Sequence, residues 1–271
     1  MSAGATNPNN PNDPFNQQKT ISGVKNIIAI ASGKGGVGKS TVATNLALAL
    51  REFGNVGLLD ADIYGPSLPR MMGALNQKPT VSEGNKITPV VRYNIKMMSI
   101  GFLVDEGSAV VWRGPMLFKA MDQFFRDVIW GDLDYLIIDL PPGTGDVQLS
   151  LVQKVPVNYA VIVTTPQNIS LIDAKKAIDM FERTGVKIAG VIENMSYMLN
   201  PTTGEKIQLY PKGDLNSYLD AKKLEKLGEI PFNPSVSLGS EAGIPIVESN
   251  SDGVEAVCFK EIAKKLAART Q

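Results

Sequence analysis

Histidine is absent from the 271 residues of this chain, and cysteine occurs once, as Cys258. Without histidine the chain has no imidazole base, no Ser-His-Asp or Cys-His nucleophile and no histidine metal ligand. A single cysteine excludes an intrachain disulfide, a Cys-x-x-Cys redox pair and a four-cysteine metal site within one chain, and it fits a reducing compartment. Any catalysis must therefore use carboxylates, amines, hydroxyls and backbone groups.

An excess of either charge is also lacking, because 27 Lys and Arg residues balance 27 Asp and Glu residues. A net charge of zero gives no global field that would attract nucleic acid or an acidic membrane surface, so neither partner is expected. No run approaches the roughly 18 apolar residues of a membrane span, and the first residues lack the basic-then-apolar order of a signal peptide. We therefore expect a cytoplasmic protein.

The first 23 residues are rich in Asn, Pro, Ser and Gly, and Phe15 is their only aromatic residue. Such a segment cannot bury enough apolar area to order itself, so residues 1–23 are predicted to be a flexible tail. Hydrophobic residues make up 44% of the chain, which is enough for a large core. We expect residues 24–271 to form a single domain.

From Lys25 onward, short β-branched runs alternate with longer segments of helical periodicity. This alternation is typical of parallel strands joined by crossover helices, so the sequence predicts an α/β fold with a mostly parallel sheet covered on both faces. The predicted strands are Asn26–Ala31, Val56–Leu59, Ile95–Ser99, Tyr135–Asp139, Tyr159–Thr164 and Lys187–Glu193. The predicted helices are Ser40–Phe53, Pro115–Val128, Asp146–Lys154, Ile169–Thr184 and Asp252–Ala268. The Pro- and Gly-rich stretch Gln77–Pro89 predicts a hairpin or a loop.

The first predicted strand leads directly into a glycine-rich loop and then an alanine-rich helix. The loop matches G-x-x-x-x-G-K-[ST] in the strand–loop–helix context that a phosphate-binding loop requires. Its glycines let backbone N–H groups surround a phosphate, and the helix N-terminus adds positive dipole. Lys39 would neutralise the β- and γ-phosphate oxygens, and Ser40 would ligate Mg²⁺. The expected nucleotide-binding residues of the loop are Gly33, Lys34, Gly35, Gly36, Val37, Gly38, Lys39, Ser40 and Thr41.

Three aspartates stand where predicted apolar strands end. Asp60 and Asp62 lie two residues apart in VGLLDAD, on the same side of an extended segment, and Asp139 ends the run YLIID. Because the carboxyl ends of parallel strands form the ligand edge of an α/β sheet, we predict that Asp60 and Asp139 hold Mg²⁺ and that Asp62 orients the attacking water. Gly143, in the following PPGTGD, is expected to bring backbone near the γ-phosphate. Without histidine, hydrolysis would depend on positioning and electrostatics.

Seven segments of the chain together resemble the Mrp/ApbC family of P-loop ATPases, relatives of MinD, ParA and the nitrogenase iron protein. They are GKGGVGKST, LLDADIYGPSLPRMMG, MSIGFL, WRGPM, DYLIIDLPPGTGD, VTTPQ and ENMSY. The resemblance extends from about Lys25 to Leu266, and its motifs in combination are far more specific than a P-loop alone. It implies a three-layer α/β/α P-loop NTPase fold, binding and slow hydrolysis of Mg-ATP, and a homodimer formed through the nucleotide face.

The resemblance also assigns roles that spacing does not show. Lys34 matches the second lysine of the family's deviant Walker A motif, which reaches the phosphates of the facing subunit and acts there like an arginine finger. The expected catalytic residues are thus Lys34, Lys39 and Asp62. Asn194, in VIENMSY, matches the family's adenine-contacting asparagine, and the loop at Pro231, in GEIPFNP, lies where the family closes around the base.

The family carries iron–sulfur clusters, and here the sequence departs from the family pattern. Members usually follow E-N-M-S-x with a Cys-x-x-Cys pair, and two subunits together hold a bridging [4Fe–4S] cluster. This chain has Asn200 and Thr203 at the matching positions. Neutral oxygen donors are poor ligands for the thiolate-preferring iron of such clusters, so the customary cluster site is absent.

Cys258 is the only thiol left to consider. It shares a stripe at helical spacing with Val254, Val257 and Ile262. We therefore expect a buried position in the core rather than a role as a cluster ligand. The segment EIAKKLAART that follows carries lysines on one face, and no Trp or Phe follows Phe259 as an anchor. A packed terminal helix with a solvated charged face is expected, not a membrane helix.

Two functions remain open from the sequence. The family resemblance favours an ATP-hydrolysing iron–sulfur cluster carrier that assembles clusters or transfers them to apoproteins, with a partner supplying thiolates. The chemistry of Asn200 and Thr203 favours a metal-free switch, in which ATP-driven dimerisation exposes a surface to a protein client, as in MinD and ParA. A reductase like the nitrogenase iron protein is excluded, since it needs cluster cysteines of its own. Trp112 and Arg113 in WRGPM fit either a surface of the dimer or an aromatic core anchor.

Overall fold

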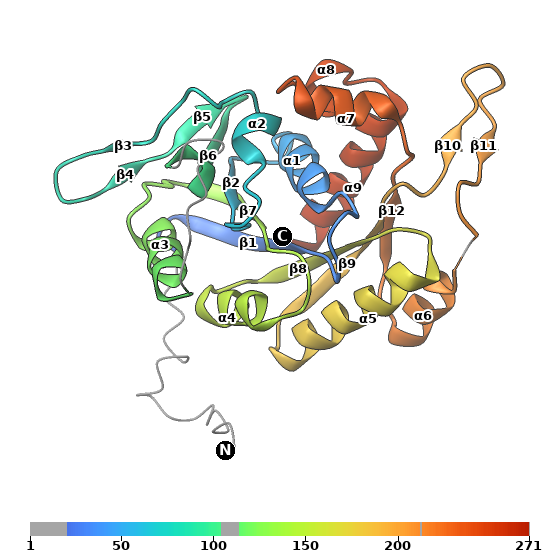
Figure 1. Cartoon of the computed structure of the whole chain (residues 1–271), viewed down its shortest axis with the longest axis horizontal. Helices are drawn as coiled ribbons and strands as arrows, with labels where there is room; N and C mark the ends of the chain where they lie inside the picture. Colours follow the sequence, from blue (N-terminus) through green and yellow to red (C-terminus); the bar gives the residue numbers. More distant parts are fainter. Residues whose placement is uncertain (1–20, 104–113, 212, 271) are drawn as a thin grey trace.

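The computed structural model describes residues 21–103, 114–211 and 213–270, and an eight-stranded sheet forms its centre (Figure 1). The strand order is β12-β9-β8-β1-β7-β2-β6-β5. Every neighbouring pair is parallel except β5 and β6, which run antiparallel. This arrangement confirms the predicted mostly parallel sheet.

The central strands are buried along almost their whole length because helices cover both faces, which explains why their sequences are apolar without alternation. The six predicted strands are all present, with ends shifted by two residues at most. The edge strands β5 and β12 were not predicted, because they are short and have no apolar run in the sequence. The sheet consists of β1 (Val24–Ala31), β2 (Val56–Asp60), β5 (Val90–Arg92), β6 (Ile95–Ser99), β7 (Leu133–Asp139), β8 (Tyr159–Thr164), β9 (Lys187–Glu193) and β12 (Lys226–Glu229).

Two helical layers sandwich the sheet and give two apolar cores, one on each face (Figure 1). One layer holds α1 (Lys39–Leu50), α2 (Leu68–Met71), α7 (Pro234–Glu241), α8 (Ile246–Ser249) and α9 (Val254–Thr270). The other holds α3 (Gly114–Arg126), α4 (Asp146–Lys154), α5 (Asn168–Arg183) and α6 (Leu215–Lys222). The 3₁₀ helix η1 (Ile100–Phe102) follows β6. The three layers confirm the predicted α/β/α architecture.

Two small hairpins extend from this body (Figure 1). The first pairs β3 (Thr80–Val81) with β4 (Ile87–Thr88), so the stretch 77–89 contains a hairpin. The second pairs β10 (Met198–Leu199) with β11 (Lys206–Ile207) and was not predicted. Within the described residues, no helix combines the length and apolarity needed to cross a bilayer.

Two expectations about the ends of the domain need correction. Ile21, assigned to the tail, is buried in the core beneath α3 and belongs to the folded part; residues 1–20 lie outside the described chain. In α9, Val254 and Val257 are each 45% exposed, although the stripe predicted them buried. The helix packs against α1 through a neighbouring face, which carries Ala256, Phe259, Ile262, Ala263, Leu266 and Ala267. A stripe of apolar residues shows periodicity, but not which face the rest of the fold covers.

Candidate nucleotide site

The glycine-rich loop joins the carboxyl end of β1 to the first turn of α1. Gly38 precedes the helix in the left-handed region, with φ of 78°, and a Cβ there would lie 2.3 Å from Nδ2 of Asn194. Gly33 approaches α5 so closely that a Cβ would lie 2.0 Å from the backbone oxygen of Asp173. Both positions therefore require glycine. The hydroxyl of Ser32 donates to the backbone oxygen of Lys34 at 2.8 Å and shapes the start of the loop.

A cavity of about 230 Å³ lies inside this loop. Its backbone N–H groups and the N-terminus of α1 make it suited to an anion. Asp62 and Pro142 close it from the segments that follow β2 and β7. The predicted loop residues that line it are Lys34, Gly35, Gly36, Gly38, Lys39, Ser40 and Thr41.

Lys39 and Asp139 form a buried ion pair at the base of this cavity. Nζ of Lys39 lies 2.5 Å from Oδ1 of Asp139, and both side chains are 6% exposed. Asp139 ends β7, where it is the register partner of Ile30 on β1 and Asp60 on β2. A buried ammonium is tolerable only with a counter-charge, and here the counter-charge comes from the neighbouring strand.

Asp60 is almost fully buried and anchors the segment that follows β2. Its carboxylate accepts hydrogen bonds from the backbone N–H of Asp62 at 3.0 Å, of Ser67 at 3.1 Å and of Leu68 at 3.2 Å. The hydroxyl of Ser99, at the end of β6, donates to it at 3.1 Å. Burial and the nearby charge of Asp139 raise the pKa of Asp60 to about 7, although the hydrogen bonds oppose this. Asp60 thus fixes the start of α2 and the turn that leads to it.

Asp62 lies in that turn and reaches the phosphate cavity. The strand β2 ends at Asp60, and the backbone N–H of Asp62 donates to Oδ1 of Asp60, so a turn begins where an extended segment was expected to continue. Asp62 lines the cavity, whereas Asp60 and Asp139 are not among its lining residues. Burial raises the pKa of Asp62; the charge of Lys39 opposes this and that of Asp139 adds to it. A half-buried carboxylate beside a phosphate cavity is suited to orienting water.

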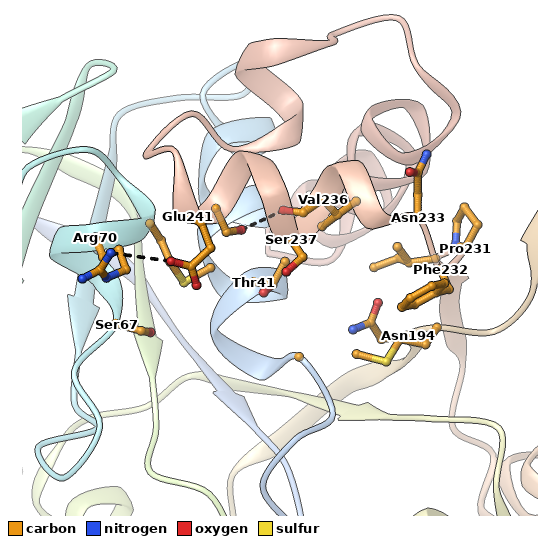
Figure 2. A pocket seen from close by; sticks show the side chains of 15 residues that line it. Thr41, Ser67, Arg70, Asn194, Pro231, Phe232, Asn233, Val236, Ser237 and Glu241 are labelled. Atoms are coloured by element: carbon orange, nitrogen blue, oxygen red, sulfur yellow. Dashed lines mark hydrogen bonds and ion pairs between the residues drawn. The ribbon is translucent and has the colours of Figure 1, made fainter.

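A second cavity, of about 330 Å³, adjoins the first, since Gly38 and Thr41 line both (Figure 2). Asn194 and Pro231 lie at one end, as the family resemblance predicts, and Arg70 and Glu241 form a 3.6 Å ion pair at the other. Nδ2 of Asn194 donates to the backbone oxygen of Val37 at 2.8 Å, so this residue also braces the glycine-rich loop. The remaining lining residues are Ser67, Met71, Met195, Ile230, Phe232, Asn233, Val236, Ser237 and Ser240.

Most predicted site residues thus line two joined cavities, whereas Gly33, Val37, Asp60, Asp139 and Gly143 line neither. The backbone N–H of Gly143 donates to the oxygen of Ser32 at 3.0 Å and ties the loop after β7 to the end of β1. Sequence reasoning missed Ser99, although MSIGFL drew attention to its segment. It also missed the contributions of α2 and α7 to the second cavity, although Ser67, Arg70 and Met71 lie within LLDADIYGPSLPRMMG. No motif signalled the residues of α7.

Asn200 and Thr203, which the resemblance matches to the family's cysteines, lie in the turn of the β10–β11 hairpin. Oδ1 of Asn200 accepts hydrogen bonds from the backbone N–H groups of Thr202 at 2.9 Å and Thr203 at 3.2 Å. The hydroxyl of Thr203 donates to Oε2 of Glu205 at 3.1 Å. These polar groups satisfy one another within the turn, as Asx-turns do. Among the described residues, no group of three or more Cys, Asp or Glu side chains is placed to hold a metal.

Cys258 is half-buried and packs against the core formed by α1 and α9. Burial raises the pKa of its thiol, and the charge of Glu255 raises it further. A thiol with a raised pKa is a poor source of thiolate. Cys258 therefore lies at the edge of the core and is only partly buried, whereas a buried position was expected. Trp112 and Arg113 lie outside the described residues.

Comparison with known proteins places the chain in a family. Residues 23–267 match the profile of the ParA group described as NUBPL iron-transfer P-loop NTPase. The chain is 48% identical over 256 residues to an "Iron-sulfur cluster carrier protein" of Aquifex aeolicus, covering 94% of this chain and 70% of that protein. A protein of the same name from Escherichia coli K12 is 47% identical over 93% of this chain and 69% of its own length.

Solved structures agree with the sequence relatives. A nucleotide-binding protein of Archaeoglobus fulgidus in complex with ADP superposes with a TM-score of 0.73 at 38% identity, covering 85% of this chain and 90% of that one. The cell division ATPase MinD of Pyrococcus furiosus has a TM-score of 0.66 at 23% identity, over 90% of this chain and 99% of that one, and supports the fold alone. The chain therefore belongs to the Mrp/ApbC/NUBPL family of iron-transfer P-loop NTPases, as its seven segments predicted.

Proposed function

We propose that this protein binds Mg-ATP, hydrolyses it slowly, and uses the cycle to carry iron–sulfur clusters to apoproteins, the role for which its relatives are named. The observation that carries the proposal is the complete phosphate cavity with its buried Lys39–Asp139 pair, in a chain that matches those relatives along almost its whole length. The adjoining cavity at Asn194 and Pro231 has room for an adenosine group.

The residues around the phosphate cavity fit Mg²⁺. Ser40 lines the cavity and Asp139 contacts Lys39, so both would offer this hard cation the oxygen donors that it prefers. Asp60, which already accepts four hydrogen bonds, would join them by exchanging one of those bonds. When bound, Mg²⁺ neutralises charge that develops on the phosphate oxygens. A phosphate in the cavity would compete with Asp139 for Lys39 and so release a carboxylate oxygen toward the metal. Asp62 would then hold the attacking water, and Lys39 would stabilise the γ-phosphate.

A homodimer through the nucleotide face would complete the site. Lys34 lines the cavity from the outer part of the loop, half-buried, with its ammonium available to a facing subunit. Large apolar side chains beside the loop are exposed: Tyr64 by 68%, and Ile169 and Ile172 at the start of α5 by 65% and 55%. Such side chains around a charged site are typical of a surface that is covered in one state.

The variant Lys34→Ala tests the dimer. We expect it to bind Mg-ATP like the wild type but to lose ATP-dependent dimerisation and turnover, measured by light scattering and phosphate release. Lys264→Ala, which removes an exposed lysine on α9, is the control. Normal assembly and turnover of Lys34→Ala would contradict a role in trans.

The hairpin favours a second candidate function. Asn200 and Thr203 carry no thiolate, and their side-chain oxygens already form hydrogen bonds within the turn. The position that the resemblance matches to the family's cysteines therefore offers no ligand to a cluster. A metal-free switch would use the same nucleotide cycle to expose a surface to a protein client. The clusters of a carrier would instead need other thiolates, either Cys258 from each subunit or cysteines of a partner.

Anaerobic reconstitution with ferrous iron and sulfide separates the two candidates. About four irons per dimer, with a thiolate-to-iron absorption band that Cys258→Ala removes, would support a carrier with an unusual ligand set. Iron that binds stoichiometrically only when a cysteine-containing apoprotein is present would support a carrier that shares its cluster. No stoichiometric iron under either condition, with ATP still hydrolysed, would support the switch.

A further inference from the structure

Gln148 is a buried carboxamide that has no hydrogen-bond partner in the described chain. It is 1% exposed, and neither its Nε2 nor its Oε1 is paired. It shares one face of α4 with Leu151 and Val152, which are buried in the core on that side of the sheet. Buried polar groups in folded proteins are nearly always paired, because an unpaired amide loses its hydrogen bonds to water without replacement. A second conformation of the protein, in which the amide of Gln148 gains a hydrogen-bond partner, would replace these hydrogen bonds.

The location of Gln148 indicates which state that is. Helix α4 begins after Gly145, so Gln148 is its third residue, the position from which a Gln side chain commonly reaches back to the backbone before the helix. The preceding loop starts at Asp139, the partner of Lys39, and its Pro142 lines the phosphate cavity. The segment from Leu140 to Gln148 thus borders the phosphate cavity near one end, and it carries the unpaired amide at the other.

The two glycines of the segment between these ends have open surroundings. A Cβ added at Gly143 or Gly145 would meet no atom within 4 Å, so little is packed against either residue. The backbone N–H of Gly143 holds the segment to Ser32 by one hydrogen bond. Its peptide groups offer both donors and acceptors, which match the two polar atoms of a carboxamide.

We propose that Gln148 is a positioning residue for ATP hydrolysis: its carboxamide is unpaired without nucleotide and forms hydrogen bonds to the backbone of residues 141–145 when that loop closes on bound phosphate. The inference rests on the proposed ATPase function. The gained hydrogen bonds would hold the closed loop at the γ-phosphate, so Gln148 would act on the reaction through the loop and not by touching the nucleotide.

Replacement by an apolar side chain of similar length tests this. Without nucleotide, Gln148→Met removes the unpaired amide and should raise Tm by about 3 °C or more. With Mg-ATP, the rise in Tm caused by nucleotide should be smaller than in the wild type, because the variant cannot form the new hydrogen bonds. Turnover should fall about tenfold with KM changed by less than about threefold, since the lost contacts belong to the closed state.

Two further variants complete the design. Gln148→Leu repeats the test with a different shape, in case Met packs poorly. Gln153→Met, on the same helix but with its amide partly exposed and partnered, is the matched control and should leave the nucleotide-induced rise in Tm unchanged. Hydrogen exchange at the amides of residues 143–147 should slow on addition of Mg-ATP in the wild type and slow less in Gln148→Met.

Two results would overturn the proposal. If both apolar variants lower Tm without nucleotide, the amide is already paired, for example by an internal water. If they raise Tm but leave turnover and the nucleotide-induced shift unchanged, the amide is a core defect without a role. Calorimetry of Mg-ATP binding to the wild type separates these results from failure of the proposed function. A wild type that binds no Mg-ATP overturns the ATPase itself, whatever Gln148→Met does to Tm.

Discussion

The carboxyl end of the sheet and the turn of the β10–β11 hairpin both gather polar side chains, but they satisfy them in opposite ways. At the sheet, Lys39, Asp60 and Asp139 come from distant parts of the chain and are buried. Lys39 and Asp139 pair with each other, and Asp60 accepts hydrogen bonds from Ser99 and from backbone N–H groups of the segment after β2. In the hairpin, Asn200 finds its partners within the next three residues at the surface.

This difference distinguishes a site whose pairing a ligand would change from a turn whose hydrogen bonds are complete without a ligand. A buried network whose charges are balanced across strands changes when a phosphate or a metal enters, because the pairing has to be redistributed. An exposed turn with local hydrogen bonds is complete as it stands. The structure thus has a buried charge network where the family resemblance places the nucleotide, and a self-contained polar turn where it places the cluster. The following predictions test that contrast.

Lys39→Ala should have the largest effect. It removes the ammonium that would contact the phosphates, so we expect the affinity for Mg-ATP in calorimetry to fall by more than about 100-fold. It also leaves Asp139 buried without its counter-charge, which should lower the free energy of unfolding by about 3 kcal/mol.

The double variant Lys39→Ala/Asp139→Asn separates the two effects. It should recover much of the lost stability, because no buried charge is left unpaired, but none of the affinity. ATP affinity equal to that of the wild type in either variant would contradict the phosphate site.

Asp62→Ala should abolish turnover while ATP still binds. The side chain lines the phosphate cavity and accepts a local hydrogen bond, from the backbone N–H of Gly65 at 3.3 Å. Loss of its carboxylate should therefore lower kcat by about 100-fold and change the affinity for Mg-ATP by less than about threefold. Single-turnover phosphate release measures the first and calorimetry the second. Asp127→Ala, remote from the cavity, is the control. A variant that hydrolyses ATP at the normal rate would remove Asp62 from the mechanism.

The contrast also explains which parts of the fold and the site could be predicted from the sequence. The glycine-rich loop, Asp139 and the central strands were predictable because their signals lie in consecutive residues: an apolar run, then a phosphate-binding motif or a strand-end carboxylate. The ion pair of Arg70 with Glu241 was not predictable, because it depends on α2 packing beside α7, far along the chain. For the same reason the exposed positions of Val254 and Val257 escaped a pattern that records only periodicity.

Introducing the family's two cysteines should turn the hairpin into an iron–sulfur cluster site. In Asn200→Cys/Thr203→Cys, two thiolates per subunit replace neutral oxygens, and we expect about four irons per dimer after anaerobic reconstitution. Loss of the Asn200 side-chain hydrogen bonds should lower the free energy of unfolding of the metal-free variant by about 1 kcal/mol. Asn200→Cys alone is the control, because one thiol per subunit leaves the ligand set incomplete. If the double variant binds no more iron than the wild type, the turn cannot present thiolates to a cluster.

Asp60→Asn should have the smallest effect, a change in how stability depends on pH. Burial and Asp139 raise the pKa of Asp60 to about 7, above the value of about 3.9 for an unfolded chain, so between these values the folded protein holds a proton that the unfolded chain has released. The stabilisation is therefore complete below about pH 4 and is lost as the pH rises through 7, with a slope of at most about 1.4 kcal/mol per pH unit. Asp60→Asn should be less stable overall, because an amide nitrogen would face some of the donors that surround the carboxylate, but its stability should decline less between pH 4.5 and 7.5. Urea unfolding of the nucleotide-free proteins across this range measures both effects. If the free energies of unfolding of the two proteins depended on pH in the same way, the pKa of Asp60 would be the same in the folded and unfolded chains. The carboxyl end of the sheet would then be open to solvent, as the hairpin is.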